Sequence, residues 1–184
     1  MSILMPGAVW SPENETVTAA LKQFPGNIGV WGFIGFTMIS GLIAGVSINA
    51  VFAFGEEIGW RGYLVKLFEG QSFIRTSIIT GGIWGLWHAP IILNGHNYPQ
   101  HPMAGVFMMT IMCIMLTPVL LYFRKKSGSV IVPAVMHGTF NGVVGLSNIF
   151  ILPANDLLIG GPGLAGILVL FGTDIIIFLY DRYI

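Results

Sequence analysis

Long apolar stretches separated by short polar segments dominate the chain. The longest, Ile28 to Phe54, contains no charged residue and exceeds the roughly 20 residues that a helix needs to cross a bilayer. Four further apolar stretches predict membrane helices over Ser72 to Leu93, Met103 to Phe123, Val130 to Leu152 and Gly163 to Tyr180. Because lipid cannot hydrate unpaired backbone groups, closed helices are the expected form. The pattern therefore predicts an all-α, polytopic transmembrane helix bundle of about five membrane spans.

The segments on either side of the first span are less regular. Residues 1–27 are mixed in character, and Ser11-Pro12-Glu13 has the composition of a helix start, so a short interfacial helix is expected from there to Phe24. After Phe54 the helical spacing continues, with Gly55 and Gly59 as points where the helix could break. We therefore divide the chain into an N-terminal interfacial segment, 1–27, and a membrane-embedded core, 28–184.

Composition and charge agree with an integral membrane protein. Hydrophobic residues make up 54% of the 184 positions and charged residues only 9%, with a mean hydropathy of +0.80; a soluble domain carries about 25% charged residues. The formal net charge of +0 offers no field to recruit nucleic acid. Under the five-span arrangement, nearly all basic residues fall on one side of the bilayer, which the positive-inside rule makes cytoplasmic. They are Arg61, Lys66, Arg75, Arg124, Lys125, Lys126 and Arg182, against Lys22 alone on the other side.

Five polar residues inside the predicted spans are difficult to explain as lipid-facing: Glu56, Glu57, His88, His137 and Asn141. From the nearest basic residue at the cytoplasmic end of its own helix, Glu56 lies 10 residues away, His88 13 and His137 11. At 1.5 Å per helical residue, these separations become about 15, 20 and 17 Å of depth. Since such residues are costly in a bilayer, three helices that bring them to one level indicate an enclosed functional site.

The two adjacent glutamates differ in their helical neighbours. Glu57 and Arg61 are four residues apart, a spacing that allows a salt bridge on one helix face. Glu56 points roughly 100° away around the helix and has no basic residue four positions on. If Glu56 faces an apolar pocket, desolvation makes it a suitable general base.

The histidines fall into two groups. His137 and Asn141 are also four residues apart, so an imidazole and an amide share one helix face and can stabilise an oxyanion. His88 lies on a third helix and, together with Glu56, could position and deprotonate water. His96 and His101 belong to the polar loop after the second span, and we interpret them as structural.

Other intramembrane hydrolytic mechanisms do not fit the sequence. Neither His88 nor His137 belongs to an HExxH zinc-protease motif. No Gly-x-Ser-Gly sequence offers a serine nucleophile at a turn, and Asp174 and Asp181 share one predicted span, so they cannot face each other from two helices.

Glycine is frequent, with 25 residues, but its spacing is uninformative. Pairs four residues apart, which favour close helix contact, are no more numerous than chance placement gives. They are Gly41/Gly45, Gly55/Gly59, Gly81/Gly85 and Gly138/Gly142.

Three ordered motifs on successive spans carry a family resemblance. They are Glu56-Glu57-x-x-x-Arg61, Trp84-x-x-x-His88 and His137-x-x-x-Asn141, within GEEIGWRGYL, GGIWGLWHAPIIL and PAVMHGTFN. In this order they closely resemble the CAAX prenyl protease 2 and bacteriocin-processing (CPBP, or Abi) family of intramembrane proteases, over roughly Gly41 to Ile151. Trp84 stands where that family usually has phenylalanine, an exchange expected to alter packing only.

The resemblance implies an intramembrane endopeptidase in a prokaryotic cell membrane, with residues 28–184 as its protease core. Carried over residue by residue, it implies that Glu56 and His88 activate the attacking water. His137 and Asn141 would hold the oxyanion, and Glu57 and Arg61 would support them. The implied partner is a membrane-associated protein or peptide, prenylated or not, cleaved from the cytoplasmic side.

Two alternatives stay open at this level. Glu56, His88 and His137 could supply one carboxylate and two imidazoles to Zn²⁺, while the same residues also suit a metal-free mechanism, which the absence of a compact zinc signature favours slightly. The alternative function is a proton- or ion-coupled membrane transport protein that uses Glu56 and the histidines as a relay. An inactive family member acting as a binding or immunity partner is a third possibility.

Overall fold

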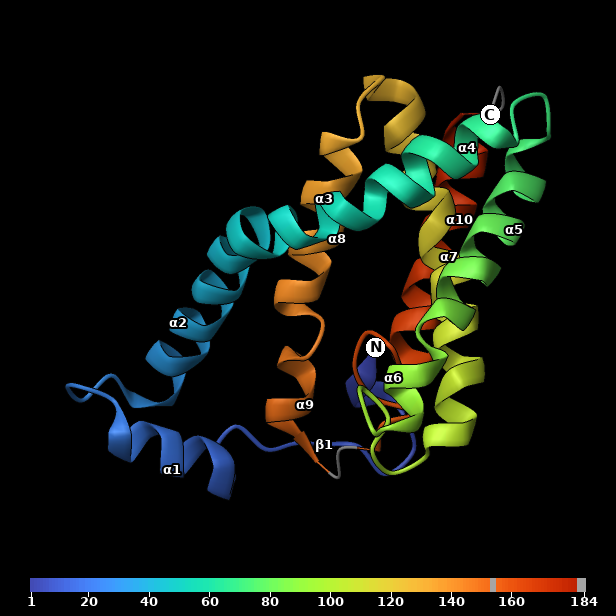
Figure 1. The fold of residues 1–184 in the computed structure, drawn as a ribbon. Coiled ribbons are helices and arrows are strands. Elements are labelled where there is room, and N and C mark those ends of the chain that lie inside the picture. The colour runs from blue at the N-terminus through green and yellow to red at the C-terminus, as the bar shows by residue number, and fades with distance from the viewer. Residues whose placement is uncertain (153–154, 182–184) are drawn as a thin grey trace.

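The structure, a computed structural model of the chain, describes residues 1–152 and 155–181. It is helical almost throughout (Figure 1), which confirms the predicted all-α membrane bundle. Arg182, one of the basic residues counted above, lies outside the described residues. The described helices are η1 (Ser2–Leu4), α1 (Glu15–Gln23), α2 (Gly29–Ala44), η2 (Gly45–Asn49), α3 (Ala50–Glu57), η3 (Ile58–Leu64), α4 (Val65–Leu67), α5 (Phe73–Trp87), α6 (Ala89–Leu93), α7 (Pro102–Ser127), α8 (Ile131–Val143), α9 (Leu146–Phe150) and α10 (Leu164–Tyr180).

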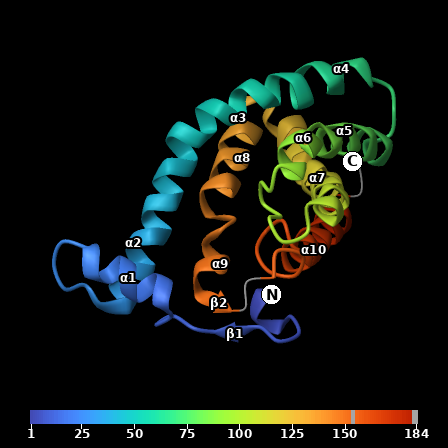
Figure 2. The same cartoon turned by 60° about the horizontal axis from the view of Figure 1, so that its bottom comes forward.

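The first predicted span is part of one long helix that continues beyond Phe54. Helices α2, α3 and α4 join through the π-helical turns η2 and η3 into a single run of 39 residues, Gly29–Leu67. Gly55 and Gly59 do not break it. At 1.5 Å per residue the run is roughly 58 Å long, about twice the hydrocarbon thickness. Figures 1 and 2 show that the run bends along its length, so that α2 rises steeply and the part from α3 to α4 passes obliquely across α8.

The second predicted span is interrupted beside a proline. Pro90 has no backbone N–H and cannot continue the hydrogen-bond ladder, so α5 ends at Trp87 and α6 begins at Ala89. His88 occupies the junction, and its backbone N–H bonds to the Gly85 carbonyl at 3.1 Å. His88 therefore lies at the break between the two helices.

The fourth predicted span is also two helices. The ends of α8 and α9 are separated by Val144 and Gly145, and the last two residues of the predicted span, Ile151–Leu152, form the short strand β2. This strand pairs antiparallel with β1, Val9–Trp10. The third and fifth predicted spans correspond to α7 and α10, within a few residues of the expected ends.

The predicted start of the N-terminal helix was wrong. Helix α1 begins at Glu15, and the side chain of Asn14 caps it by accepting a hydrogen bond from Val17 N at 3.1 Å. Asparagine is as good an N-cap as serine, so Ser11 was only the first of two competent caps. The predicted end near Phe24 is confirmed, since Phe24 is the C-cap.

Helix α8 stands in the middle of the bundle. The long helix packs on one side of it and α7 contacts it on the other, while α5 and α10 pack on α7 (Figure 2). Close approach depends on glycine at two positions. A Cβ on Gly138 would lie 2.4 Å from Ala50 N, and a Cβ on Gly85 would lie 2.4 Å from Thr110 Cα. Both distances are too short for any side chain, so these contacts require glycine.

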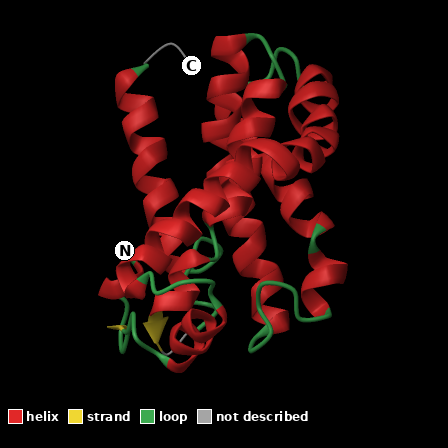
Figure 3. Cartoon of the chain, turned by 90° about the vertical axis from the view of Figure 1, so that its left-hand side faces the viewer, coloured by secondary structure: helices red, strands yellow, loops and turns green. Residues whose placement is uncertain are grey.

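The outward faces of the helices are apolar, as lipid contact demands. Phe52, Phe107 and Met103 are among many large hydrophobic side chains that are two-thirds or more exposed. Two helices, Gly29–Leu67 and Pro102–Ser127, are long and apolar enough to cross a membrane by length and composition. Loops and the strand pair lie mainly at the two ends of the bundle (Figure 3). A soluble protein would bury such residues, whereas a membrane bundle leaves them facing acyl chains.

Candidate active site

A cavity of about 420 Å³ opens between the long helix, α8 and the α5–α6 junction. The four residues predicted to be catalytic, from three predicted spans, all line it, so the structure brings them together as the sequence predicted. The full lining consists of Asn49, Phe52, Glu56, Trp84, Trp87, His88, Ile91, His96, Asn97, Met109, Met112, Leu116, His137, Phe140, Asn141, Val144 and Pro162.

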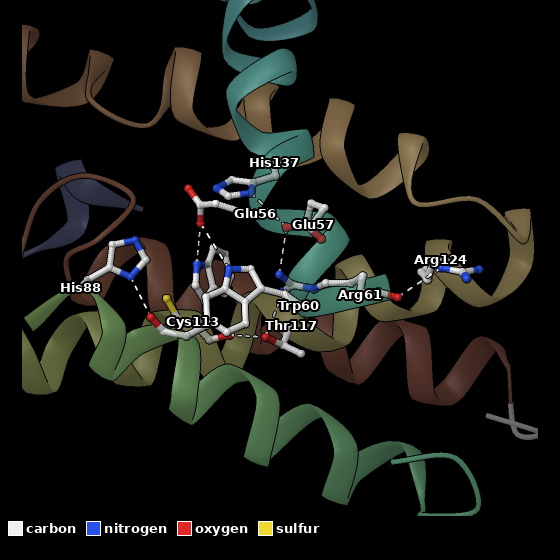
Figure 4. Close-up of polar contacts among 10 residues, drawn as sticks. Glu56, Glu57, Trp60, Arg61, His88, Cys113, Thr117, Arg124 and His137 are labelled. Atoms are coloured by element: carbon white, nitrogen blue, oxygen red, sulfur yellow. Dashed lines mark hydrogen bonds and ion pairs between the residues drawn. The ribbon is translucent and has the colours of Figure 1, made fainter. Parts of the chain in front are cut away.

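Two indole groups hold the Glu56 carboxylate (Figure 4). Its Oε2 accepts a hydrogen bond from Trp84 Nε1 at 2.9 Å and a longer one from Trp60 Nε1 at 3.4 Å. The expectation that Trp84 alters packing only was therefore wrong. Trp60 follows Glu56 by four residues, a helical spacing that could have indicated this contact. Trp84 belongs to one of the three motifs, but nothing in the sequence indicated that it bonds to Glu56.

His88 is oriented by the helix break at Pro90. Its ring nitrogen Nδ1 lies 2.8 Å from the main-chain oxygen of Trp84. A carbonyl oxygen only accepts, so Nδ1 carries the hydrogen, and in the neutral ring Nε2 keeps a free electron pair. Trp87 packs edge-on against the ring at 5.1 Å between centroids. His88 can thus accept a proton through Nε2 from a molecule in the cavity.

Glu57 and Arg61 form the predicted salt bridge, which is fully buried. Arg61 Nη1 lies 2.9 Å from Glu57 Oε1, with the two side chains 1% and 0% exposed. Arg61 Nη2 donates to Thr117 Oγ1 at 3.1 Å, and its Cζ lies 4.5 Å from the centre of the Trp84 ring. Removing one charge would leave the other buried without its counter-charge, so the pair acts as an internal clamp.

His137 extends this buried network toward the cavity. Its Nδ1 lies 3.0 Å from Glu57 Oε1, and its ring packs edge-on to Trp84 at 5.0 Å. The carboxylate accepts, so Nδ1 carries the hydrogen, and Nε2 becomes a second donor only when the ring is protonated. The sequence paired Glu57 with Arg61 alone; the structure adds His137 as a second partner of the same carboxylate oxygen.

The two histidines in the loop between α6 and α7 differ in their positions. His101 Nδ1 lies 2.7 Å from Asp156 Oδ1, which agrees with its structural interpretation. His96 instead lines the cavity together with Asn97, and Asn49 of the long helix lines it too. None of these three was predicted as a site residue, because a loop position and an isolated asparagine carry no periodic signal.

The side chains present do not fit a metal centre. Within residues 1–152 and 155–181, no group of three or more His, Cys, Asp or Glu side chains is placed to hold a metal ion. Glu56, His88 and His137 line one cavity, and Nδ1 of each histidine is already hydrogen-bonded, to Glu57 and to the Trp84 carbonyl, but the three side chains are not grouped closely enough to share one ion. We therefore derive no step through zinc.

Glu56 lies less deep than the sequence predicted. The predicted depth holds for a straight helix close to the bilayer normal, but the long helix that carries Glu56 runs obliquely (Figure 1). The 10 residues between Glu56 and Lys66 therefore span less depth than about 15 Å. The convergence on one cavity nevertheless holds.

Comparisons with known proteins place these residues in a family. The family model for Rce1-like proteins, described as type II CAAX prenyl endopeptidase, matches residues 31–143. This range includes the four residues predicted to be catalytic, Glu56, His88, His137 and Asn141. CAAX prenyl protease 2 of Methanococcus maripaludis is 32% identical over 77 residues, which make up 41% of this chain and 28% of that protein. The match thus spans little more than a quarter of the relative. No solved structure matches. Since the family model covers more than half of the chain, this protein belongs to the Rce1-like family of type II CAAX prenyl endopeptidases.

Proposed function

We propose that this protein is an intramembrane endopeptidase that hydrolyses a peptide bond with water activated by Glu56 and His88. The observation that carries the proposal is the shared cavity, where an acid, two imidazoles and an amide from separate helices meet inside the region matched by the family model. Residues 28–184 would form the protease core and residues 1–27 an interfacial segment. The bilayer is that of a prokaryotic cell.

Glu56 would act as the principal base. Its carboxylate takes a proton from water, and the hydroxide so formed attacks the carbonyl carbon of the scissile peptide bond. His88 Nε2, left free by the bond of Nδ1 to Trp84 O, orients the same water. The proton held by Glu56 then passes to the leaving nitrogen as the carbon–nitrogen bond breaks, giving a free amine and a carboxylate.

His137 and Asn141 would stabilise the oxyanion of the tetrahedral intermediate. Asn141 donates from its side-chain amide, and His137 donates from Nε2 in its protonated form. The buried Glu57 carboxylate, 3.0 Å from Nδ1, holds the ring in position. Donors fixed before the reaction stabilise developing charge without reorganisation, and the Glu57–Arg61 clamp supplies this rigidity.

The substrate we propose is a membrane-associated protein or peptide that reaches this cavity. The Methanococcus relative is named CAAX prenyl protease 2, and a prenylated tail is accordingly one candidate. A peptide leader is another. Either would present an extended segment to a cavity with apolar walls formed by Phe52, Ile91 and Phe140.

Mass spectrometry of new protein N-termini in membranes tests this proposal. Membranes containing the wild-type chain are compared with membranes containing Glu56→Gln, which keeps the side-chain shape, and Glu69→Gln, which removes an exposed carboxylate outside the cavity. We expect a set of N-termini that the wild type and Glu69→Gln generate and Glu56→Gln does not. If all three membranes give the same N-termini, the proposed hydrolysis is refuted.

A further inference from the structure

A second cavity, of about 460 Å³, lies at the opposite end of the Glu57–Arg61 clamp. It is bounded by η3 and α4, by the turn before α5 and by the C-terminal part of α7. This is the end of the bundle where all the described basic residues except Lys22 gather, the cytoplasmic end in the proposed orientation. The catalytic proposal does not use it.

The charge of this cavity is unbalanced. Lys66, Arg124 and Lys125 line it, whereas Glu69 is the one acidic residue in the described lining. Arg61 also borders the cavity, but Glu57 already neutralises it. Like charges that line one space favour the entry of an anion, which reduces their mutual repulsion.

Two side chains that line the cavity have polar groups without a hydrogen-bond partner among the described residues. Arg124 Nε donates to the Arg61 main-chain oxygen at 3.3 Å, which fixes the guanidinium beside the cavity (Figure 4). Its two terminal nitrogens bond to no other described residue and remain available as a fork. Thr76, only 5% exposed, also lines the cavity, and no described residue accepts or donates a hydrogen bond at its hydroxyl.

We propose that this cavity binds a phosphate group, carried either by an anionic lipid of the adjacent leaflet or by a small soluble phosphate. The two terminal nitrogens of an arginine can donate two parallel hydrogen bonds to phosphate oxygens. Lysines add positive charge on a flexible side chain that does not require one fixed orientation. Basic pockets between membrane helices at the cytoplasmic face are suited to lipid headgroups. Val65 and Phe68, which also line the cavity, would contact the start of an acyl chain.

Thermal unfolding of the full chain in bilayer nanodiscs tests the proposal in two arms. In the first, phosphatidylglycerol replaces phosphatidylcholine stepwise. In the second, inorganic phosphate is added to phosphatidylcholine discs at an ionic strength matched with chloride. The readout is the concentration that gives the half-maximal rise in Tm. The variants are Arg124→Gln and Lys66→Gln, with Arg75→Gln as control, because Arg75 is an exposed cation at the same end of the bundle but outside the cavity.

We expect Arg124→Gln and Lys66→Gln to need roughly 10-fold more ligand, the loss of one charge-assisted hydrogen bond, while Arg75→Gln behaves as the wild type. A response in the lipid arm alone identifies a headgroup, and a response to inorganic phosphate identifies a soluble source. If Arg124→Gln fails to fold, Lys66→Gln decides, since Lys66 is exposed. Equal weakening by Arg75→Gln, or no rise in Tm in either arm, overturns the proposal. None of these results depends on proteolysis.

Discussion

Trp84 donates a hydrogen bond from its indole nitrogen to the Glu56 carboxylate at 2.9 Å. The same residue offers its main-chain oxygen to His88 Nδ1 at 2.8 Å. One tryptophan thus fixes both groups that we propose to activate water, one through its side chain and the other through its backbone. The water-activating pair is therefore set by the position of a single residue on α5.

Replacing the indole tests this arrangement. Trp84→Phe removes the N–H donor while keeping an aromatic ring against Arg61 and His137. We expect kcat to fall roughly 10-fold, the cost of one hydrogen bond to a charged group, with KM little changed because the cavity wall keeps its shape. Trp60→Phe, which removes the longer 3.4 Å bond, should cost less. Equal activity of Trp84→Phe and the wild type in a cleavage assay would show that Trp60 alone holds Glu56.

The two proposed water-activating residues can be removed separately. Glu56→Gln and His88→Ala should each reduce the rate of cleavage by roughly 10²–10⁴-fold, the range for a positioned acid or base. Insertion into the membrane and elution as a single species should be unchanged, because neither residue belongs to the buried clamp. Glu69→Gln serves as the control. Retained cleavage in both variants would remove the mechanism.

The oxyanion role of Asn141 has a matched control in the same cavity. Asn141→Ala should lower kcat by roughly 10²–10³-fold, the effect of deleting one oxyanion donor. Asn49→Ala removes an amide that lines the cavity from the long helix, and we expect it to change kcat by no more than a few-fold. The measurement is steady-state cleavage of one peptide by both variants. Similar losses in kcat for the two variants would mean that Asn141 is not an oxyanion donor.

The buried clamp predicts a non-additive effect on stability. Arg61→Met leaves Glu57 buried without its counter-charge and should destabilise the fold by roughly 3–5 kcal/mol. In the double variant Glu57→Gln/Arg61→Met, no charge is left unpaired, so we expect it to be more stable than Arg61→Met alone. A double-mutant cycle of unfolding free energies measures this coupling. If the losses in unfolding free energy of Glu57→Gln and Arg61→Met simply add in the double variant, the two side chains do not stabilise each other.

The sequence predicted the local features of this fold well. Apolar runs located the five helical segments because a segment that faces lipid is apolar along its whole length. The four-residue spacing of Glu57 and Arg61 predicted their salt bridge. Contacts between helices could not be read in this way. His137 meets Glu57 from 80 residues away and Trp84 meets Glu56 from 28, and no periodicity relates those positions. The three motifs indicated which residues converge, but not which atoms bond.

The sequence spacing of the glycines does not show which of them lie at helix contacts. The number of glycine pairs was unremarkable, yet the surroundings of individual glycines differ sharply. On α5, a Cβ on Gly85 would lie 2.4 Å from Thr110 Cα, whereas a Cβ on Gly82 would meet nothing within 4 Å. Both residues lie on the same helix, so both gain similarly from the higher helix propensity of alanine.

Gly82→Ala should therefore stabilise the protein by roughly 0.5–1 kcal/mol, the usual difference between alanine and glycine within a helix. Gly85→Ala should lower the Tm, because the added methyl group forces α5 and α7 apart along their whole contact. The measurement is thermal unfolding of the two variants beside the wild type. Equal shifts of Tm would mean that the helices can separate at no cost, and the close contact between α5 and α7 would then not be what holds Trp84 and His88 against the long helix.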